Sequence, residues 1–332
     1  GYSVSLNEDG SIVAIGSPYN QYPRGHVRIF EYISNNWIQL GQDIEGEYGY
    51  NISGSYGDES GNSISLSDNG NRIAIGARTN DGFGQSTPGS GHVRIYEFNG
   101  DNWIQLGSDL DGEASYDQFG YSVALSGNGN RLVVGAQNNT GFADWPNSYL
   151  GSTTVFEWNS SMAEWEQLGQ VIDGQNMGDV SGYAVACSDD GNTIIIGSPG
   201  NGSNGVPQYG YVRVFNFIEP NWIQVGQNIN GDLEYDRLGQ AVSISNNGNI
   251  IAIGASDANE QSGLVRIYEN VNNEWIQIGE DINGENPGDL NGCSVSLSGD
   301  GSLVLVGSYG NDENGFSSGK VRLFKHLDNS FY

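Results

Sequence analysis

One sequence pattern recurs six times along the 332 residues of this chain. Each copy opens on a motif close to G-x-S-V-S-L-S-x-D-G-N-x-I-A-I-G-A, continues with G-x-V-R-I-Y-E and ends near N-W-I-Q-L-G-x-D-I-x-G-E. The copies start at steps of 60, 59, 62, 57 and 53 residues. A period of this size, built from short apolar runs, is typical of a repeat architecture. We therefore divide one domain, residues 1–332, into repeats 1–60, 61–119, 120–181, 182–238, 239–291 and 292–332.

Each repeat contains four runs that predict β-strands. The first run alternates apolar and polar residues, as in 121–125, and the second is continuously apolar, as in 73–76. A third alternating run, as in 93–97, is followed by a polar turn and a fourth run marked by tryptophan. Glycine recurs in the turn between the first two runs, where a positive φ closes a short hairpin. These glycines are Gly10, Gly70, Gly129, Gly191, Gly248 and Gly301.

Six copies of a four-stranded antiparallel unit predict an all-β, six-bladed β-propeller. A single blade is too small to bury both of its faces, so neighbouring blades must cover them. We expect the aromatic residue of the fourth strand to act as a packing wedge between blades, the alternative being an exposed ligand platform. Membership of a larger ring or a longer repeat array stays open. The residues at this position are Trp37, Trp103, Trp165, Trp222, Trp275 and Phe331.

Short motifs in the repeats resemble a known family. Gly1-Tyr2-Ser3-Val4, Ala14-Ile15-Gly16-Ser17-Pro18 and Gly25-His26-Val27-Arg28-Ile29-Phe30 resemble the FG-GAP repeats of integrin-alpha-type propellers, and the resemblance covers the whole chain. It implies a propeller used for extracellular adhesion, ligand binding or surface display, usually without catalysis. The family's calcium loop, D-x-D-x-D-G-x-x-D, is shortened here to S-x-D-G-N. The calcium sites of that loop therefore do not carry over to this chain.

The chain is strongly acidic, with 40 acidic and 12 basic residues and a formal net charge of −28. Such a surface repels nucleic acid and anionic membranes, and it suits a high-salt or calcium-bearing medium; solubility alone is the alternative explanation. The chain has no apolar run long enough for a membrane span. Cys187 and Cys293 occupy different places in their repeats, and we expect no bridge between them. Because the chain begins at Gly1, we expect a processed product or a fragment.

Acidic and amide residues recur in the loop that leads to the next repeat. Oxygen ligands at positions 1, 3, 5 and 9 are a spacing found in calcium loops, so these loops are candidate calcium sites. Alternatively, the D-I-x-G segment ends a strand with its Ile in the core, and the Asp three residues before each repeat's Gly caps a turn. Repeat three has Val171 at the first position. The strongest sets are Asp109, Asp111, Glu113 and Asp117 in repeat two, and Asp281, Asn283, Glu285 and Asp289 in repeat five.

Arginine recurs at one place in the third strand. We expect these arginines to pair with a recurring Asp and to satisfy backbone carbonyls; a ring of arginines that binds an anion is the alternative. Repeat three has Thr154 at this place. The five arginines are Arg28, Arg94, Arg213, Arg266 and Arg322.

Catalytic patterns are missing from the sequence. The three histidines, His26, His92 and His326, do not join a Ser/His/Asp, Cys/His or two-histidine metal pattern, and the carboxylates are too numerous to single out an acid/base pair. We therefore expect no enzyme activity, and keep a glycosidase- or lyase-type propeller as a third hypothesis.

The variable loops between the second and third strands carry aromatic residues that could stack on sugars. The alternative is that these rings fold back and hold the long loops in place. The ligand-binding candidates are Trp145, Tyr149, Tyr19, Tyr22 and Tyr209, with Phe83, Phe142 and Phe316 as further exposed rings.

Four N-x-S/T sequons fall in expected loops, at Asn51, Asn138, Asn159 and Asn201, and permit glycosylation.

The first functional hypothesis is a non-catalytic extracellular or cell-surface propeller with a structural or adhesive role, as a module of a longer protein or filament. The second is a carbohydrate- or protein-binding module that uses the loop face, assisted by calcium. Its partners are then other copies of the chain or other extracellular proteins and glycans, with no nucleic acid and no membrane insertion.

Overall fold

The computed structural model describes residues 1–20, 24–47, 57–82, 87–139, 149–200, 209–327 and 330–331. The chain is an all-β, six-bladed β-propeller in which each repeat forms one antiparallel sheet, as the repeat pattern predicts. It consists of two compact units, Gly1–Ile172 and Asp173–Tyr332, which are described separately below.

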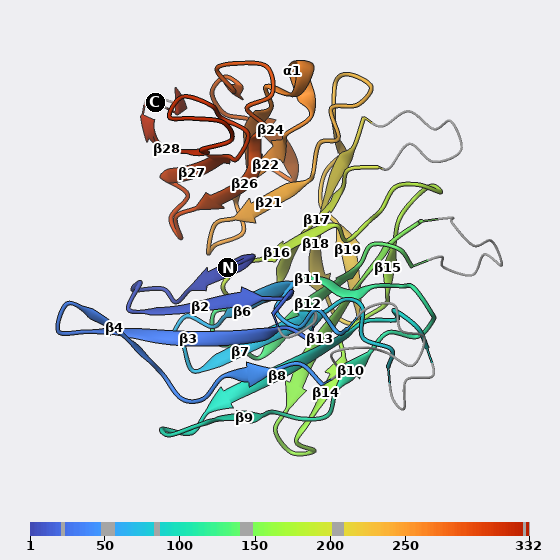
Figure 1. The fold of residues 1–332 in the computed structure, drawn as a ribbon. Helices are drawn as coiled ribbons and strands as arrows, with labels where there is room; N and C mark the ends of the chain where they lie inside the picture. The colour runs from blue at the N-terminus through green and yellow to red at the C-terminus, as the bar shows by residue number, and fades with distance from the viewer. Residues whose placement is uncertain are drawn as a thin grey trace. The chain divides into compact units, whose positions relative to one another are not determined.

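Unit 1 holds the first three repeats, and in each of them the four main strands pair in chain order. The blue strands β2, β3 and β4 in Figure 1 lie side by side in the first of these sheets. The strands are β1 (Ser3–Leu6), β2 (Ile12–Ser17), β3 (His26–Ile33), β4 (Asn36–Gln39) and β5 (Ile44–Glu45) in repeat one; β6 (Ser63–Leu66), β7 (Arg72–Ala77), β8 (His92–Phe98), β9 (Trp103–Gln105) and β10 (Leu110–Asp111) in repeat two; and β11 (Phe119–Leu125), β12 (Arg131–Ala136), β13 (Ser152–Asn159) and β14 (Glu164–Gln167) in repeat three. The chain passes from unit 1 to unit 2 within the short strand β15 (Ile172–Asp173).

Unit 2 holds the last three repeats, with the same strand order. A short helix, α1 (Ala258–Gln261), lies in one of its variable loops and has left-handed backbone angles at Asn259 and Glu260, so it is too short and irregular to give the sequence a helical period. The strands are β16 (Ala184–Cys187), β17 (Thr193–Ser198), β18 (Tyr211–Ile218), β19 (Asn221–Gln224) and β20 (Ile229–Asn230) in repeat four; β21 (Ala241–Ile244), β22 (Ile250–Ala255), β23 (Leu264–Val271), β24 (Glu274–Gln277) and β25 (Ile282–Asn283) in repeat five; and β26 (Asn291–Leu297), β27 (Leu303–Ser308), β28 (Lys320–Leu327) and β29 (Ser330–Phe331) in repeat six.

Five repeats add a two-residue strand that the four-strand prediction lacked. The strands β5, β10, β15, β20 and β25 each pair with the third strand of their own repeat. They arise from the D-I-x-G segment, in which the apolar residue points into the core: Ile44, Ile229 and Ile282 are 4%, 4% and 7% exposed. The core position of the Ile is thus confirmed, but the segment forms a strand of its own and not the end of another strand.

The turn between the first two strands is held by side chains. In repeat six, Asp300 Oδ1 accepts hydrogen bonds from Ser298 Oγ at 2.6 Å and from the Ser302 amide at 2.9 Å. Ser298 Oγ in turn accepts a bond from the Leu303 amide at 2.9 Å. The six turn glycines have φ between 65° and 74°, which confirms their predicted role. The shortened loop is thus a compact turn stabilised by its own Ser and Asp or Asn residues.

We expect the pKa of Asp300 to be about 2, because the Ser298 hydroxyl and then the Ser302 amide and hydroxyl donate to its charged form. A carboxyl whose pKa is depressed on folding stabilises the protein above its unfolded pKa, so this contribution is present above about pH 4 and is lost as the pH falls toward 2. An NMR titration of the Asp300 carboxyl carbon measures the pKa, and Ser298→Ala should move it toward 3.8. A midpoint near 3.8 in the unsubstituted protein would contradict the expectation.

Neighbouring blades approach most closely at two glycines. A Cβ added at Gly76, in β7, would lie 2.1 Å from the carbonyl oxygen of Gly120 and 2.3 Å from Ser63 Oγ. Ser65 Oγ also accepts a hydrogen bond from the Leu125 amide at 3.0 Å across the same interface. The I-G-A motif of one repeat and the first glycine of the next are therefore two halves of one contact, which has no room for a side chain. The equivalent pairs are Gly16 with Gly61, Gly197 with Gly239, and Gly254 with Gly292.

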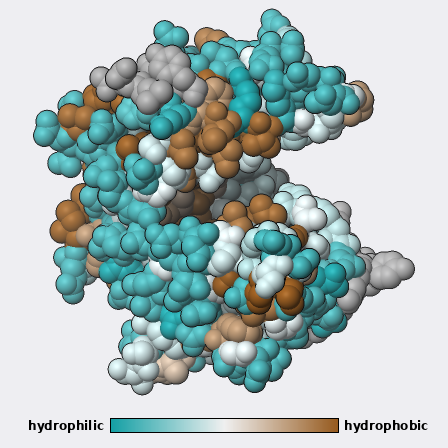
Figure 2. Space-filling model, turned by 90° about the vertical axis from the view of Figure 1, so that its left-hand side faces the viewer, coloured by the Kyte–Doolittle hydropathy of each residue, from teal (hydrophilic) through white to brown (hydrophobic). Residues whose placement is uncertain are grey.

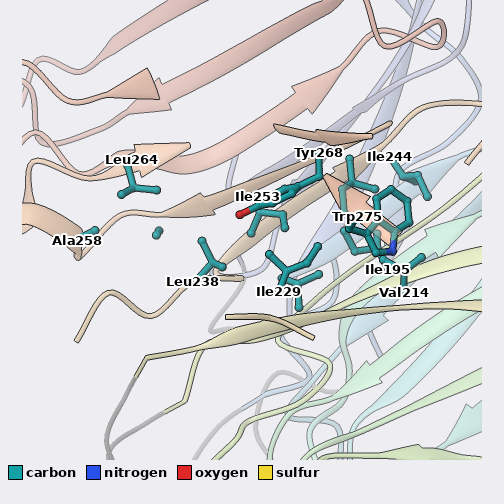
Figure 3. Packing of buried hydrophobic residues seen from close by; sticks show 13 residues of the cluster. Ile195, Val214, Ile229, Leu238, Ile244, Ile253, Ala258, Leu264, Tyr268 and Trp275 are labelled. Atoms are coloured by element: carbon teal, nitrogen blue, oxygen red, sulfur yellow. The ribbon is translucent and has the colours of Figure 1, made fainter. Parts of the chain in front are cut away.

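The tryptophan wedges are confirmed in the interior of both units. The indole Nε1 atoms of Trp103, Trp165 and Trp275 donate to the carbonyl oxygens of Leu40, Leu106 and Val225, each in the preceding repeat, at 2.9, 3.0 and 3.1 Å. Figure 3 shows Trp275 beside Ile195 and Val214 in the buried cluster of repeats four and five. Trp37 differs: it is 48% exposed, because no earlier repeat of unit 1 covers its ring. Trp37 thus lies at the edge of unit 1, and the wedge of repeat one stays a prediction.

The surface of the protein is mostly hydrophilic, as the many charged and polar residues of the sequence lead us to expect. Hydrophilic residues cover most of the face in Figure 2, and the hydrophobic residues there lie in separate groups. No disulfide joins Cys187 to Cys293, as expected. Among the described residues, none of the helices is long and apolar enough to span a bilayer.

Candidate functional site

The recurring arginines of the third strand bind acidic groups or carbonyls of the connecting segments. Arg28 donates from Nε and Nη2 to Asp43 Oδ2 at 2.9 Å. Arg266 bonds both Asp281, at 3.0 Å, and Asp232 of the preceding repeat. These contacts confirm the predicted pairing with a recurring Asp in repeats one and five.

The arginines of repeats four and six instead bind backbone. Arg213 Nη2 donates to the carbonyl of Asp173, and Arg322 Nη2 donates to the carbonyl of Asn283, each at 2.7 Å. Each acceptor is the second residue of a short strand of the preceding repeat. The third-strand position thus places a guanidinium group against the end of the preceding blade.

Repeat three departs from this arrangement, and a pocket takes the place of the arginine. Thr154 stands at the arginine position and Val171 at the position of its partner Asp, so neither charge is supplied by β13 or its connecting segment. The resulting pocket has a volume of about 230 Å³ and lies wholly within unit 1. It is lined by Asp109, Leu110, Asp111, Glu113, Asp117, Phe119, Ala136, Asn139, Ser152, Thr154, Phe156, Gln167 and Val171.

All four carboxylates predicted for a calcium loop in repeat two line this pocket, and its described lining contains no arginine or lysine. Asp117 is 2% exposed and caps a turn: its Oδ2 accepts bonds from the Ala114 amide at 3.0 Å and from Asn139 Nδ2 at 3.1 Å. Burial nevertheless raises the pKa of Asp117, and the charge of Glu113 adds to the shift. Burial and then the charges of Asp109 and Glu47 raise the pKa of Asp111. The described lining of the pocket therefore supplies carboxylates without a cationic side chain, and Arg94 acts on Asp111 from outside this lining.

A second cluster lies beside the pocket, at the start of β8. The buried His92 directs Nδ1 toward Asp109 Oδ2 and Asp111 Oδ1, at 4.0 and 3.9 Å, and this nitrogen has no hydrogen-bond partner. Glu47, which follows β5, brings a carboxylate into the same cluster. Burial, with the charge of Arg94, lowers the pKa of His92 well below its ordinary value, so the imidazole is neutral at pH 7.

Sequence reasoning singled out Asp109 and Asp111 but not His92, because His26 and His92 share one repeat position. The signal that does mark the site is the pair of exceptions in the neighbouring repeat, Thr154 and Val171. Where one repeat lacks the arginine that the other repeats carry, the carboxylates that would face this arginine lose their partner within the protein.

The acidic residues predicted for a calcium loop in repeat five form ion pairs with basic side chains or accept hydrogen bonds in turns. Asp281 binds Arg266, and Glu285 binds Lys320 Nζ at 2.8 Å. Asp289 Oδ2 accepts bonds from the amides of Glu285 and Asn286 at 3.1 and 3.0 Å, and the Asn283 side chain bonds Asn259 and its own segment. The capping role predicted for the Asp before each repeat is confirmed here, while the calcium site of repeat five stays a prediction.

The aromatic candidates are distributed over several loops. Tyr19 is 58% exposed and packs edge-on against Tyr2, with ring centroids 5.7 Å apart; Tyr209 is 43% exposed. Tyr149 is half-buried, and Phe316 is 94% exposed. Trp145, Tyr22, Phe83 and Phe142 lie outside the described residues.

The sequons differ in their surroundings. Asn138 lies in a turn after β12, as expected, whereas Asn51 and Asn201 lie outside the described residues. Asn159 is the last residue of β13 and not a loop residue, so that placement is wrong. Its Oδ1 accepts bonds from the amides of Ser161 and Met162, and its Nδ2 donates to Glu166 at 3.0 Å. The side chain is thus used to close the β13–β14 hairpin.

Comparisons with known proteins agree with this fold. The sequence model described as FG-GAP repeat matches residues 110–156 and 283–324. No curated protein matches the sequence. Among solved structures, the chain is similar to a putative 6-phosphogluconolactonase from Bacteroides uniformis, with a TM-score of 0.63, 10% identity, and coverage of 100% of this chain and 83% of that one. It is also similar to the periplasmic gluconolactonase of Pseudomonas aeruginosa, with a TM-score of 0.61, 13% identity, and coverage of 99% and 83%.

Another similar structure is the hydrazine synthase of Kuenenia stuttgartiensis, with a TM-score of 0.57, 12% identity, and coverage of 98% of this chain and 83% of that one. At such low identities these likenesses concern the fold alone. Together with the sequence match, they identify the chain as a six-bladed β-propeller that carries FG-GAP repeats.

Proposed function

We propose that this chain is a non-catalytic, extracellular binding and adhesion propeller that holds a cationic side chain of a partner protein in the pocket of repeats two and three. One observation carries the proposal: the arginine of the third strand is replaced by Thr154, while groups that bind this arginine in other repeats are retained. The partner then supplies the missing guanidinium or ammonium group.

The retained groups can be named by their equivalence. Arg213 and Arg322 donate to the carbonyls of Asp173 and Asn283, and the equivalent residue at the pocket is Asp111. Arg266 bonds Asp232, and the equivalent residue at the pocket is Glu113. Both residues line the pocket, which is therefore equipped to bind a planar, multiply donating cation.

The size and charge of the pocket support the same class of ligand. Its volume of about 230 Å³ is below the range usual for drug-sized ligands and suits a single long side chain. The net charge of −28 attracts a basic partner and raises its association rate. The extracellular location and the adhesive role rest on the resemblance to FG-GAP propellers.

Thr154→Arg should abolish this binding, because the introduced arginine restores the guanidinium that the other repeats place there. We expect at least a tenfold weaker binding of an arginine-rich peptide, measured by fluorescence anisotropy at low salt in the presence of EDTA. The matched control is Asn102→Arg, which makes the same change of charge in the exposed β8–β9 turn, outside the pocket lining. We expect the control to weaken binding less than threefold.

Two results would contradict the proposal. If both variants weaken binding equally, the peptide responds to net charge and not to the pocket. If the unsubstituted protein does not bind the peptide at all, the pocket does not accept an external cation. Thermal unfolding of Thr154→Arg should occur at or above the temperature of the unsubstituted protein, which separates a filled pocket from a damaged fold.

A further inference from the structure

We propose that His92, Asp109, Asp111 and Glu47 form a binding site for a divalent transition-metal ion of the zinc, manganese or cobalt class. The site lies at the interface of repeats one and two, at the start of β8. It goes beyond the proposed function, because it requires neither Thr154 nor a partner protein.

The ligand atoms already converge. One ligand atom from each of Glu47, His92 and Asp109 lies within 4.8 Å of the others. His92 Nδ1 is 4.0 Å from Asp109 Oδ2 and 3.9 Å from Asp111 Oδ1. Ligands held about 2.1 Å from one tetrahedral ion lie about 3.4 Å apart, so the two aspartates need to close by roughly 0.5 Å. Their side chains are 31% and 35% exposed, which leaves them room to move.

His92 supplies an independent reason to expect a ligand. Its side chain is 1% exposed, and Nδ1 is a buried nitrogen with no hydrogen-bond partner. The separations of 3.9 and 4.0 Å from the aspartate oxygens are too long for hydrogen bonds. A buried polar atom without a partner destabilises the fold, and a metal ion bound through Nδ1 removes that cost.

The charged side chains of the cluster also favour a cation. Glu47, Asp109 and Asp111 bring together three carboxylates. The facing cation is Arg94, whose Nη1 lies 3.8 Å from Glu47 Oε1. The other polar contacts are amides: Gln105 Nε2 donates to Asp109 Oδ1 at 2.6 Å, and Asn80 Nδ2 lies 3.5 Å from Glu47 Oε2. A divalent ion bound here brings positive charge to the three carboxylates.

Repeat one has the same residue types, but its polar groups have internal partners. His26 Nδ1 is 2.7 Å from Asn20 Nδ2, and Asp43 is held by both Nε and Nη2 of Arg28. Arg94, the equivalent of Arg28, has a buried Nη2 without a hydrogen-bond partner. Among the described residues, His92 Nδ1 thus lacks the hydrogen-bond partner that Asn20 gives to His26 Nδ1 in repeat one.

The ligand set distinguishes between metals. Calcium prefers six to eight oxygen ligands, whereas an imidazole nitrogen combined with carboxylates suits zinc and related transition metals. The site therefore differs in chemistry from the all-oxygen calcium loop that the spacing of Asp109, Asp111, Glu113 and Asp117 suggests. Asp109 and Asp111 are shared by both arrangements, but His92 belongs only to the first.

The test compares His92→Gln with His26→Gln, its matched control in repeat one. Binding of Zn²⁺, Co²⁺ and Ca²⁺ to the whole chain is measured by equilibrium dialysis after removal of metal with EDTA, and the visible spectrum of bound Co²⁺ reports nitrogen coordination. We expect one Zn²⁺ or Co²⁺ per chain with micromolar or tighter affinity. His92→Gln should weaken this binding at least about 100-fold, since loss of a ligand exceeds the effect of an outer-shell change. His26→Gln should weaken it less than threefold.

Three outcomes would overturn the proposal: absence of Zn²⁺ and Co²⁺ binding up to 100 μM, equal binding by His92→Gln, or preferential Ca²⁺ binding that is independent of His92. If His92→Gln does not fold, the Asp111→Asn variant takes its place in the test. The Asp111 side chain is about one-third exposed, so its replacement should leave the fold intact. Loss of this carboxylate should weaken Co²⁺ binding at least tenfold, and unchanged binding would overturn the proposal. Peptide binding by His92→Gln in EDTA should equal that of the unsubstituted protein, so failure here and failure of the proposed function are distinguishable.

Discussion

Replacing Trp103 with alanine should destabilise unit 1 by about 3–5 kcal/mol, the range found for buried aromatic residues cut back to alanine. Trp103 is 2% exposed, its indole donates to the Leu40 carbonyl at 2.9 Å, and its backbone amide donates to Gln42 Oε1 at 2.9 Å. The Phe98 ring lies 5.2 Å from it, centroid to centroid. The substitution therefore leaves a cavity between repeats one and two and an unpaired carbonyl. Urea unfolding followed by tryptophan fluorescence and circular dichroism measures the loss.

Trp37→Ala is the matched control for this prediction. Trp37 occupies the same position in repeat one and contacts Tyr32 at 5.1 Å, but it is 48% exposed. Because much of its surface already meets water, we expect a loss of at most about 1.5 kcal/mol. Equal losses in the two variants would show that the wedge position does not depend on burial between blades.

Gly76→Ala should destabilise the protein by about 3 kcal/mol or more, although it adds only one methyl group. The new Cβ would lie 2.1 Å from the Gly120 carbonyl oxygen and 2.3 Å from Ser63 Oγ. The oxygen belongs to backbone that is fixed at the start of β11, and Ser63 Oγ donates to this same carbonyl at 2.8 Å. The two blades must therefore separate or the hydrogen bond must break. The midpoint of urea unfolding measures the change.

Ala77→Ser provides the control for Gly76→Ala. It also adds one heavy atom, at the next position of β7, and the equivalent residues in other repeats are already serines, at Ser17, Ser198 and Ser308. Because three other repeats accommodate a serine hydroxyl at this position, we expect a smaller loss of stability than for Gly76→Ala, in which the added atom clashes with fixed backbone. A Gly76→Ala variant as stable as Ala77→Ser would mean that the blades are not held together at this contact.

Much of the architecture could be predicted because local signals are repeated six times. The turn glycines, the apolar second strand and the wedge position occur in almost every copy, so a weak signal in one repeat is supported by the others. The additional strands β5, β10, β15, β20 and β25 were missed because two residues carry too little pattern to predict a strand.

The candidate sites were only partly predictable. The sequence showed that Asp109 and Asp111 carry oxygen ligands, and that Thr154 and Val171 break the repeated pattern. It could not show that Arg266 holds Asp281 while Arg94 leaves Asp109 to other partners, because both arginines occupy the same repeat position. The difference depends on side-chain geometry at the interface between consecutive repeats.

By itself, the sequence determined the number of blades, the main strands of each repeat and the tight turns between the first two strands. These features depend on backbone conformation and hydrophobic pattern, both of which are local and recur with the repeat. The tertiary structure alone decided which copies of a repeated polar residue find a partner within the protein. It leaves His92 Nδ1 without one and opens a pocket at Thr154, because these outcomes depend on groups that different repeats bring together at one interface.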